Sequence, residues 1–172
     1  MISGSFNLFS RILPLYFIAR EEKFYKEGLS GSFFYTETLL HCFGVYSAVF
    51  GIKDYEQSLA SHIKLLKEGK NVAIFPEGHR SKDGSLSEAK GGVVALAKAA
   101  NAPIVPVAVS GILRITLKEF LLRKRFVTIR FGKPIFPEEL FEGYENAVPQ
   151  DYKKIATEKV MKGIEKVLMG TN

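Results

Sequence analysis

The sequence predicts an α/β fold, a single domain in which a mixed sheet is covered by helices. Short apolar runs rich in β-branched and aromatic residues recur along the chain, and segments with helical spacing of apolar residues alternate with them. A length of 172 residues with 47% apolar residues suits one hydrophobic core. Because no internal repeat or low-complexity tract divides the chain, we expect one domain over residues 1–172.

Four runs are expected strands: 13–20, 71–75, 103–109 and 126–132. The first three are mainly apolar and predict buried strands, whereas "FVTIRFG" alternates apolar and polar residues like a half-exposed strand. Pro106 interrupts the third run, which indicates a sheet edge or a bulge because proline has no N–H to donate. The aromatic-rich segment 33–50 leaves helix and strand equally open.

Three segments have the spacing of helices. The first begins at a capping box of Asp54 and Gln57 and closes at Gly69. The second, 92–100, is made of small residues, and the third, about 151–169, has one apolar stripe. Strands and helices in this order give the α/β prediction.

The chain is basic, with a formal net charge of +6 and a pI of about 9.3. This charge favours anionic partners such as phosphorylated metabolites, acidic lipid or nucleic acid. The stretch "RKRFVTIRFGK", residues 123–133, interleaves bases with phenylalanines, but a solvated strand face explains it more simply than a nucleic-acid site. We therefore expect an anionic membrane surface as a partner and no nucleic acid.

The expected location is the cytoplasm, peripheral at the inner face of the membrane. Cys42 is the only cysteine, so no intramolecular disulfide forms and a reducing compartment is the default. Residues 1–20 are apolar, but polar residues, a glycine and a proline interrupt them, so we expect neither a signal peptide nor a spanning helix. A segment lying on the membrane surface stays open.

The main candidate site is "FPEGHRS", residues 75–81, which directly follows an expected strand. Turns at this place bind ligands in α/β proteins because backbone donors converge there. Gly78 permits a positive φ or close approach, Arg80 offers a planar fork of donors to a phosphate, and Ser81 adds a donor. Glu77 either fixes that fork or accepts from a substrate hydroxyl. The alternative is a surface loop in which Glu77 and Arg80 pair for local order.

The turn and three later motifs resemble the glycerolipid acyltransferases of the 1-acylglycerol-3-phosphate acyltransferase type. "FPEGHRS" matches the family's Phe-Pro-Glu-Gly-x-Arg-Ser motif at every defined position, and "EAKGG", "PIVPV" and "FGKPI" are similar to later family motifs. The resemblance covers about residues 17–136. It implies transfer of a fatty acyl group, in phospholipid biosynthesis, from acyl-CoA or acyl-carrier protein to a hydroxyl of a phosphorylated glycerol acceptor such as lysophosphatidic acid.

The same resemblance implies roles for six residues. Four of them would bind the acceptor, with Lys90 in support and Pro106 as a wall of the acyl or acceptor pocket; the four are Glu77, Gly78, Arg80 and Ser81. No cofactor is expected, and no metal, because no metal-ligand spacing appears. A phosphate-loop nucleotidase is excluded because "GHRSKDGS" lacks the Gly-Lys-Ser/Thr ending of that loop.

The family's catalytic pair, a histidine with an aspartate five positions later, has no counterpart here. The fifth residue after His41 is a tyrosine, after His62 a lysine and after His79 a glycine. We expect His41 in an aromatic core, His62 on the polar side of its helix and His79 in a loop. We therefore expect the chain to be N-terminally truncated, with Met1 either an internal start or the first residue of a shortened version, and to lack the catalytic segment. The alternative is a non-catalytic lipid- or phosphate-binding domain that has lost the pair.

Overall fold

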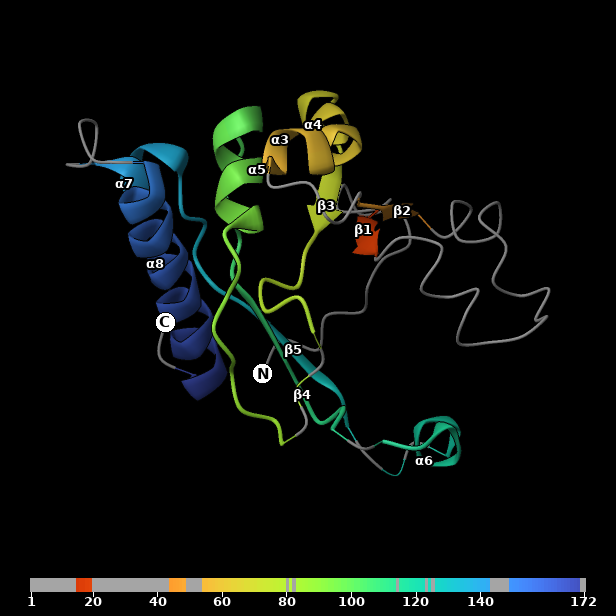
Figure 1. Cartoon of the computed structure of the whole chain (residues 1–172). Helices are drawn as coiled ribbons and strands as arrows, with labels where there is room; N and C mark the ends of the chain where they lie inside the picture. Colours follow the sequence, from red (N-terminus) through yellow and green to blue (C-terminus); the bar gives the residue numbers. More distant parts are fainter. Residues whose placement is uncertain are drawn as a thin grey trace. The chain divides into compact units, whose positions relative to one another are not determined.

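The computed structural model describes residues 15–19, 44–48, 54–79, 81, 83–113, 115–122, 124, 126–142 and 149–170. The chain divides into two compact units, Met1–Phe75 and Pro76–Asn172. Figure 1 labels their strands and helices.

The first unit contains a parallel, three-stranded sheet in the order β2-β1-β3. β1 (Leu15–Ala19) lies in the middle, between β2 (Val45–Ser47) and β3 (Asn71–Ala73). The strands expected at 13–20 and 71–75 are therefore confirmed, and β2 lies within the segment that the sequence left open. The described side chains of β1 are half-buried rather than buried, and Asn71 of β3 is exposed. β3 pairs on one side only among the described strands, so part of it stays accessible.

The helix expected between Asp54 and Gly69 is present as two pieces, α3 (Tyr55–Ser58) and α4 (Ala60–Lys67). The Asp54 carboxylate caps α3 by accepting from the Glu56 N–H at 2.9 Å. Leu59, with φ −113°, interrupts the helix between the two pieces. Gly69 has φ +75° and its N–H donates to the Leu66 carbonyl at 2.9 Å, so the predicted glycine stop is confirmed.

His62 of α4 corrects the prediction that it lies on the polar side of the helix. Its side chain is 0% exposed. The ring packs edge-on against Tyr46 of β2, with 6.3 Å between the ring centroids. Helical spacing alone did not reveal this face because the imidazole occupies a place in the core that an apolar residue usually takes.

The second unit has a helical core. α5 (Gly92–Ala100) ends at Asn101, whose φ of 48° is left-handed, so the predicted small-residue helix is confirmed. α8 (Pro149–Met169) includes the predicted C-terminal helix and packs against α5 and against α7 (Pro137–Phe141). Buried side chains from these helices make up this core: Val93, Val94, Leu96, Leu140, Ala156, Val160 and Val167.

The second unit also contains an antiparallel ribbon of β4 (Val107–Ser110) and β5 (Thr128–Phe131), in which Ser110 pairs with Thr128. Both strands are predicted by the sequence, but neither has the expected burial. Only Ala108 of β4 is buried, and every residue of β5 is exposed. The ribbon contacts α8 through β4 and β5, and two strands leave more surface open than a wide sheet does.

The α/β class is confirmed. Among the described strands the parallel and the antiparallel pairs lie in two separate sheets, the parallel one in the first unit and the antiparallel one in the second. The prediction of one domain over residues 1–172 stays a prediction. None of the described helices combines the length and the apolar content needed to cross a bilayer.

Candidate functional site

The turn that begins at Pro76 is a loop closed on itself by two hydrogen bonds. The Pro76 carbonyl accepts from the Lys90 N–H at 2.8 Å. The Glu77 carboxylate, which is half-buried, accepts through Oε2 from the Ser87 N–H at 2.8 Å. A charge-assisted bond of this kind orders a polar segment that has no regular secondary structure. Glu77 therefore shapes the loop, a role that the sequence did not predict.

Gly78 and Lys90 lie against each other at the base of this loop. Gly78 has φ +69°, a conformation that favours glycine. A Cβ at this position would lie 3.2 Å from Cδ and 3.3 Å from Nζ of Lys90. The glycine thus serves both the turn and the close approach of the lysine, and the Lys90 ammonium is placed across the turn.

Ser81 belongs to a second, exposed cluster in the same loop. Its hydroxyl donates to Asp83 Oδ1 at 3.2 Å and accepts from the Gly84 N–H at 2.8 Å. Asp83 Oδ1 also accepts from the Ser85 N–H at 2.9 Å and from the Ser85 hydroxyl at 2.6 Å. The hydroxyl and amide of Ser85, followed by the Ser81 hydroxyl, hold the pKa of Asp83 below its usual 3.8. A hydroxyl has one proton to donate, so Ser81 binds an anion only by leaving Asp83.

Arg80 lies outside the described residues, so its contact with a phosphate stays a prediction, as does the alternative pairing with Glu77. The structure brings Glu77, Gly78 and Lys90 together, and it joins Ser81 to the neighbouring Asp83 cluster.

Pro106 is a buried packing residue of the second unit. Its carbonyl accepts from the Gly132 N–H at 2.8 Å. Its Cγ lies 3.1 Å from the place that a Cβ on Gly163 of α8 would take. Ile104, before it, bridges to Ile135, so the ladder is interrupted around Pro106, as predicted. The contacts that the structure gives Pro106 are those of a core residue, and its role as a pocket wall is a prediction.

His62 is unsuited to act as a base on a bound substrate. Burial lowers its pKa below 6.5, and the nearby backbone of Tyr46 and Phe17 opposes this shift without reversing it. Neither ring nitrogen meets hydrogen-bond geometry with a partner in the described part of the chain. His79 is exposed in the turn, and His41 lies outside the described residues.

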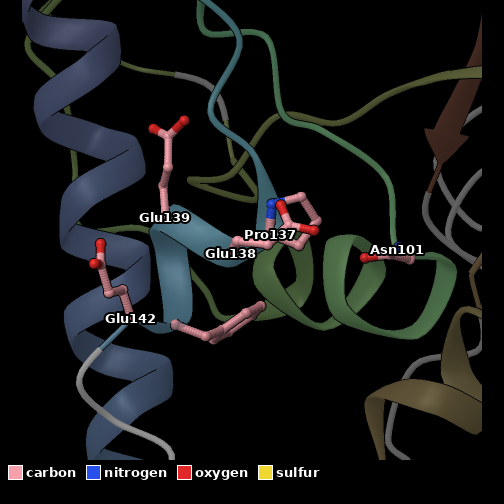
Figure 2. Close-up of a pocket in the computed structure, with 6 residues that line it drawn as sticks. Asn101, Pro137, Glu138, Glu139 and Glu142 are labelled. Carbon is pink, nitrogen blue, oxygen red and sulfur yellow. The ribbon is translucent and has the colours of Figure 1, made fainter.

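A hollow of about 500 Å³ in the second unit lies beside α7 and the end of α5 (Figure 2). It is lined by Asn101, Pro137, Glu138, Glu139, Phe141 and Glu142. Its three carboxylates would repel a phosphate, so this hollow does not suit the predicted acceptor. Across the described residues, no group of three His, Cys, Asp or Glu side chains is placed to hold a metal ion.

The fold and the turn together define a class, an α/β protein with a polar, glycine-bearing turn that follows a strand. A family model described as Acyltransferase matches residues 4–110. This chain therefore belongs to the Acyltransferase family, as the motifs of the turn indicated.

The proteins that the chain resembles in sequence are also acyltransferases. The chain is 38% identical over 76 residues to the chloroplastic 1-acyl-sn-glycerol-3-phosphate acyltransferase BAT2 of Brassica napus, covering 43% of this chain and 22% of that protein. It is 39% identical over 103 residues to the 1-acyl-sn-glycerol-3-phosphate acyltransferase of Bacillus subtilis, covering 58% and 46%. This chain thus spans less than half the length of these relatives.

The crystal structure of the 1-acyl-sn-glycerophosphate (LPA) acyltransferase PlsC from Thermotoga maritima has a similar fold. The TM-score is 0.52 at 23% identity, and the match covers 89% of this chain and 56% of that one. At this identity the match is evidence for the fold alone.

Proposed function

We propose that this chain supplies the acceptor-binding part of the acylation of 1-acyl-sn-glycerol-3-phosphate, and that its loop 76–90 binds the phosphate and glycerol of that acceptor. The observation that carries the proposal is the position of Lys90, whose ammonium lies across the left-handed Gly78 in a loop closed by Glu77. The names of the similar acyltransferases support the acceptor.

A phosphate monoester is bound best by fixed donors and by positive charge close to its oxygens. Lys90 supplies a point charge at the turn, and Arg80 adds a planar fork of donors in the role that the family motif implies. Glu77 uses Oε2 to hold Ser87, and its second oxygen is the candidate acceptor for a glycerol hydroxyl.

The proposed donor is a fatty acyl thioester of coenzyme A or of acyl-carrier protein. The acceptor hydroxyl attacks the thioester carbonyl, the new C–O bond forms, the C–S bond breaks, and the hydroxyl proton leaves on the thiol. A general base must take this proton as the attack develops, because an alcohol is a poor nucleophile at neutral pH.

A second candidate is a non-catalytic lipid- or phosphate-binding domain. It is favoured by one observation, that none of the three histidines has an aspartate five positions later. Both candidates use the same loop for the acceptor, so binding and turnover must be measured separately.

Calorimetric titration with a short-chain lysophosphatidic acid, kept below its micelle concentration, tests the binding step. Lys90→Met should weaken binding by roughly tenfold or more, since a charge-assisted contact contributes about 1.5–3 kcal/mol. Lys154→Met is the matched control, because Lys154 is an exposed lysine of α8, and it should change affinity by less than about twofold. Equal losses of affinity in the two variants would show that the loop is not the acceptor site.

We also propose that the chain is peripheral at the inner, cytoplasmic face of the membrane. Its net charge of +6 supports this proposal, because anionic headgroups attract basic surfaces. Co-sedimentation with phosphatidylglycerol vesicles at low salt tests it, and a chain that stays in the supernatant would refute it.

A further inference from the structure

Residues 111–126, between β4 and β5, form a projecting segment that we call the excursion. Because Ser110 pairs with Thr128, the chain leaves the ribbon and returns to it at the same end. The short helix α6 (Leu117–Leu121) lies beyond that end in Figure 1. Leu113 of the excursion lies near the loop 76–90, 3.3 Å from the place that a Cβ on Gly84 would take, but no residue assigned to the acceptor site belongs to the excursion.

The described part of the excursion is fixed at its base and carries a capped helix. Gly111 has φ +86°, and a Cβ there would collide with the Phe126 carbonyl oxygen, so the two ends of the excursion lie in close contact. Thr116 and Glu119 form a reciprocal capping box. In it Glu119 Oε2 accepts from the N–H and the hydroxyl of Thr116 at 2.9 and 2.8 Å, and the Glu119 N–H donates to Thr116 Oγ1 at 3.2 Å.

Large apolar side chains of the excursion face solvent. Leu121 is 69% exposed, Leu122 55% and Phe126 88%. Ile112 and Leu113 are also exposed. Leaving such side chains in water gives up the free energy that their burial would release, so several of them on one projection indicate a surface that becomes covered.

The same segment accounts for most of the net charge of the chain. Its sequence holds five bases and one acid, a net charge of +4 within the chain's +6. Lys118 and Lys124 are exposed. The single acid, Glu119, is engaged in the capping box with Thr116, so it does not offset the charges of the exposed Lys118 and Lys124.

We propose that the excursion docks this chain on an anionic bilayer, with Leu121, Leu122 and Phe126 entering the boundary between headgroups and acyl chains. Lys118 and Lys124 then face the lipid phosphates. A bilayer surface is the partner that uses both features at once, because basic side chains bind its headgroups and apolar side chains bury in its acyl region. A nucleic-acid duplex uses the bases but gains little from exposed leucines. The proposal rests on the peripheral attachment proposed above and identifies the surface responsible.

A single tryptophan tests the insertion directly, because the chain contains none. Leu122→Trp should shift its emission to the blue, and lipids brominated along the acyl chain should quench it, when vesicles of 30% phosphatidylglycerol in phosphatidylcholine are added. Met169→Trp is the control, since Met169 is an apolar residue at the end of α8 that is 71% exposed, more than Leu122. The control should bind the vesicles and keep its emission unchanged.

Partition measurements separate the two contributions. Leu121→Ser with Leu122→Ser should weaken vesicle binding by roughly tenfold or more. Replacing Lys118 and Lys124 by glutamine should cost about fivefold for each at low salt, and less at high salt. Lys154→Gln with Lys162→Gln, two exposed lysines of α8, matches that charge change and should leave most binding intact. Circular dichroism and thermal melting confirm that each variant is folded.

Three outcomes would overturn the proposal. If the Leu122→Trp variant binds vesicles without an emission shift, the chain attaches to the membrane through a surface other than the excursion. If replacing Lys154 and Lys162 weakens vesicle binding as much as replacing Lys118 and Lys124, the net charge of the chain drives binding and no particular surface is responsible. Salt-sensitive retention on a DNA duplex, lost with Lys118 and Lys124 and without vesicle insertion, would assign the segment to nucleic acid. The vesicles contain no lysophospholipid or acyl donor, so failure of the acyltransferase proposal would not alter these results.

Discussion

Two long connections of the second unit, the loop 76–90 and the excursion 111–126, are built in opposite ways. The loop is tied across its width, by Pro76 to Lys90 and by Glu77 to Ser87, and its exposed side chains are mostly polar. The excursion is fixed at its base and by a helix cap, and it exposes leucines and a phenylalanine beside bases. Internal polar bonds preserve a shape that a small anionic ligand can enter. Exposed apolar groups on a basic projection suit an extended surface.

The largest expected effect is on the rate of acyl transfer, which distinguishes binding of the acceptor by the loop from catalysis. The chain as given should release no thiol above background from an acyl-CoA in the presence of lysophosphatidic acid, because general-base assistance typically supplies 10² to 10⁴ fold and no histidine has the aspartate partner of the family. Thiol release is followed with a chromogenic disulfide. Turnover that collapses in His79→Ala would show instead that the exposed His79 of the loop is the base.

The two glycines compare how rigidly the segments are held. Gly111→Ala should lower the free energy of unfolding by about 3 kcal/mol, because the new Cβ meets the Phe126 backbone as well as an unfavourable φ. Gly78→Ala should cost only about 1–2 kcal/mol, because the atoms it meets belong to the flexible Lys90 side chain. Urea unfolding measures both. A smaller loss for Gly111→Ala than for Gly78→Ala would mean that the excursion is not anchored as described.

One arginine from each segment tests whether ligand binding belongs to the loop alone. Arg80→Ala should weaken binding of a lysophosphatidic acid analogue by about 1.5–3 kcal/mol, the contribution of a contact with a charged group. Arg123→Ala, in the excursion, should have little effect, since this residue lies outside the loop that is proposed to bind the acceptor. Calorimetric titration of both variants decides between them. Equal losses of affinity would favour the alternative that "FPEGHRS" is a surface loop in which Glu77 pairs with Arg80.

The smallest effect is a pH dependence confined to the loop. The pKa of Asp83 is lowered in the folded chain, so its hydrogen bonds from Ser81 and Ser85 are complete above the ordinary value of 3.8 and are lost as the pH falls through the lower folded value. Carboxyl-carbon NMR should give a midpoint below 3.8. Ser85→Ala should raise this midpoint more than Ser81→Ala does, because the Ser85 hydroxyl has the larger effect. A midpoint at or above 3.8 in the unsubstituted chain contradicts the cluster.

Sequence patterns that span only a few residues were sufficient to predict most of the strands and helices and the family of this protein. Runs of β-branched and aromatic residues located β1, β3, β4 and β5, and Asp54 and Gly69 marked the ends of the first helical segment. "FPEGHRS" identified both the turn and the family, because its residues act through backbone conformation and charge at fixed spacing.

Tertiary structure alone decided what each residue contacts. The bond from Glu77 to Ser87 joins residues ten positions apart, and Lys90 reaches Gly78 only because the loop closes. Burial of His62 and exposure of β5 depend on which neighbours pack on each face, and no local pattern encodes those neighbours. Backbone preferences and charge act over short separations in the chain and are readable in sequence, whereas burial and hydrogen-bond partners are set by segments that meet only in the folded state.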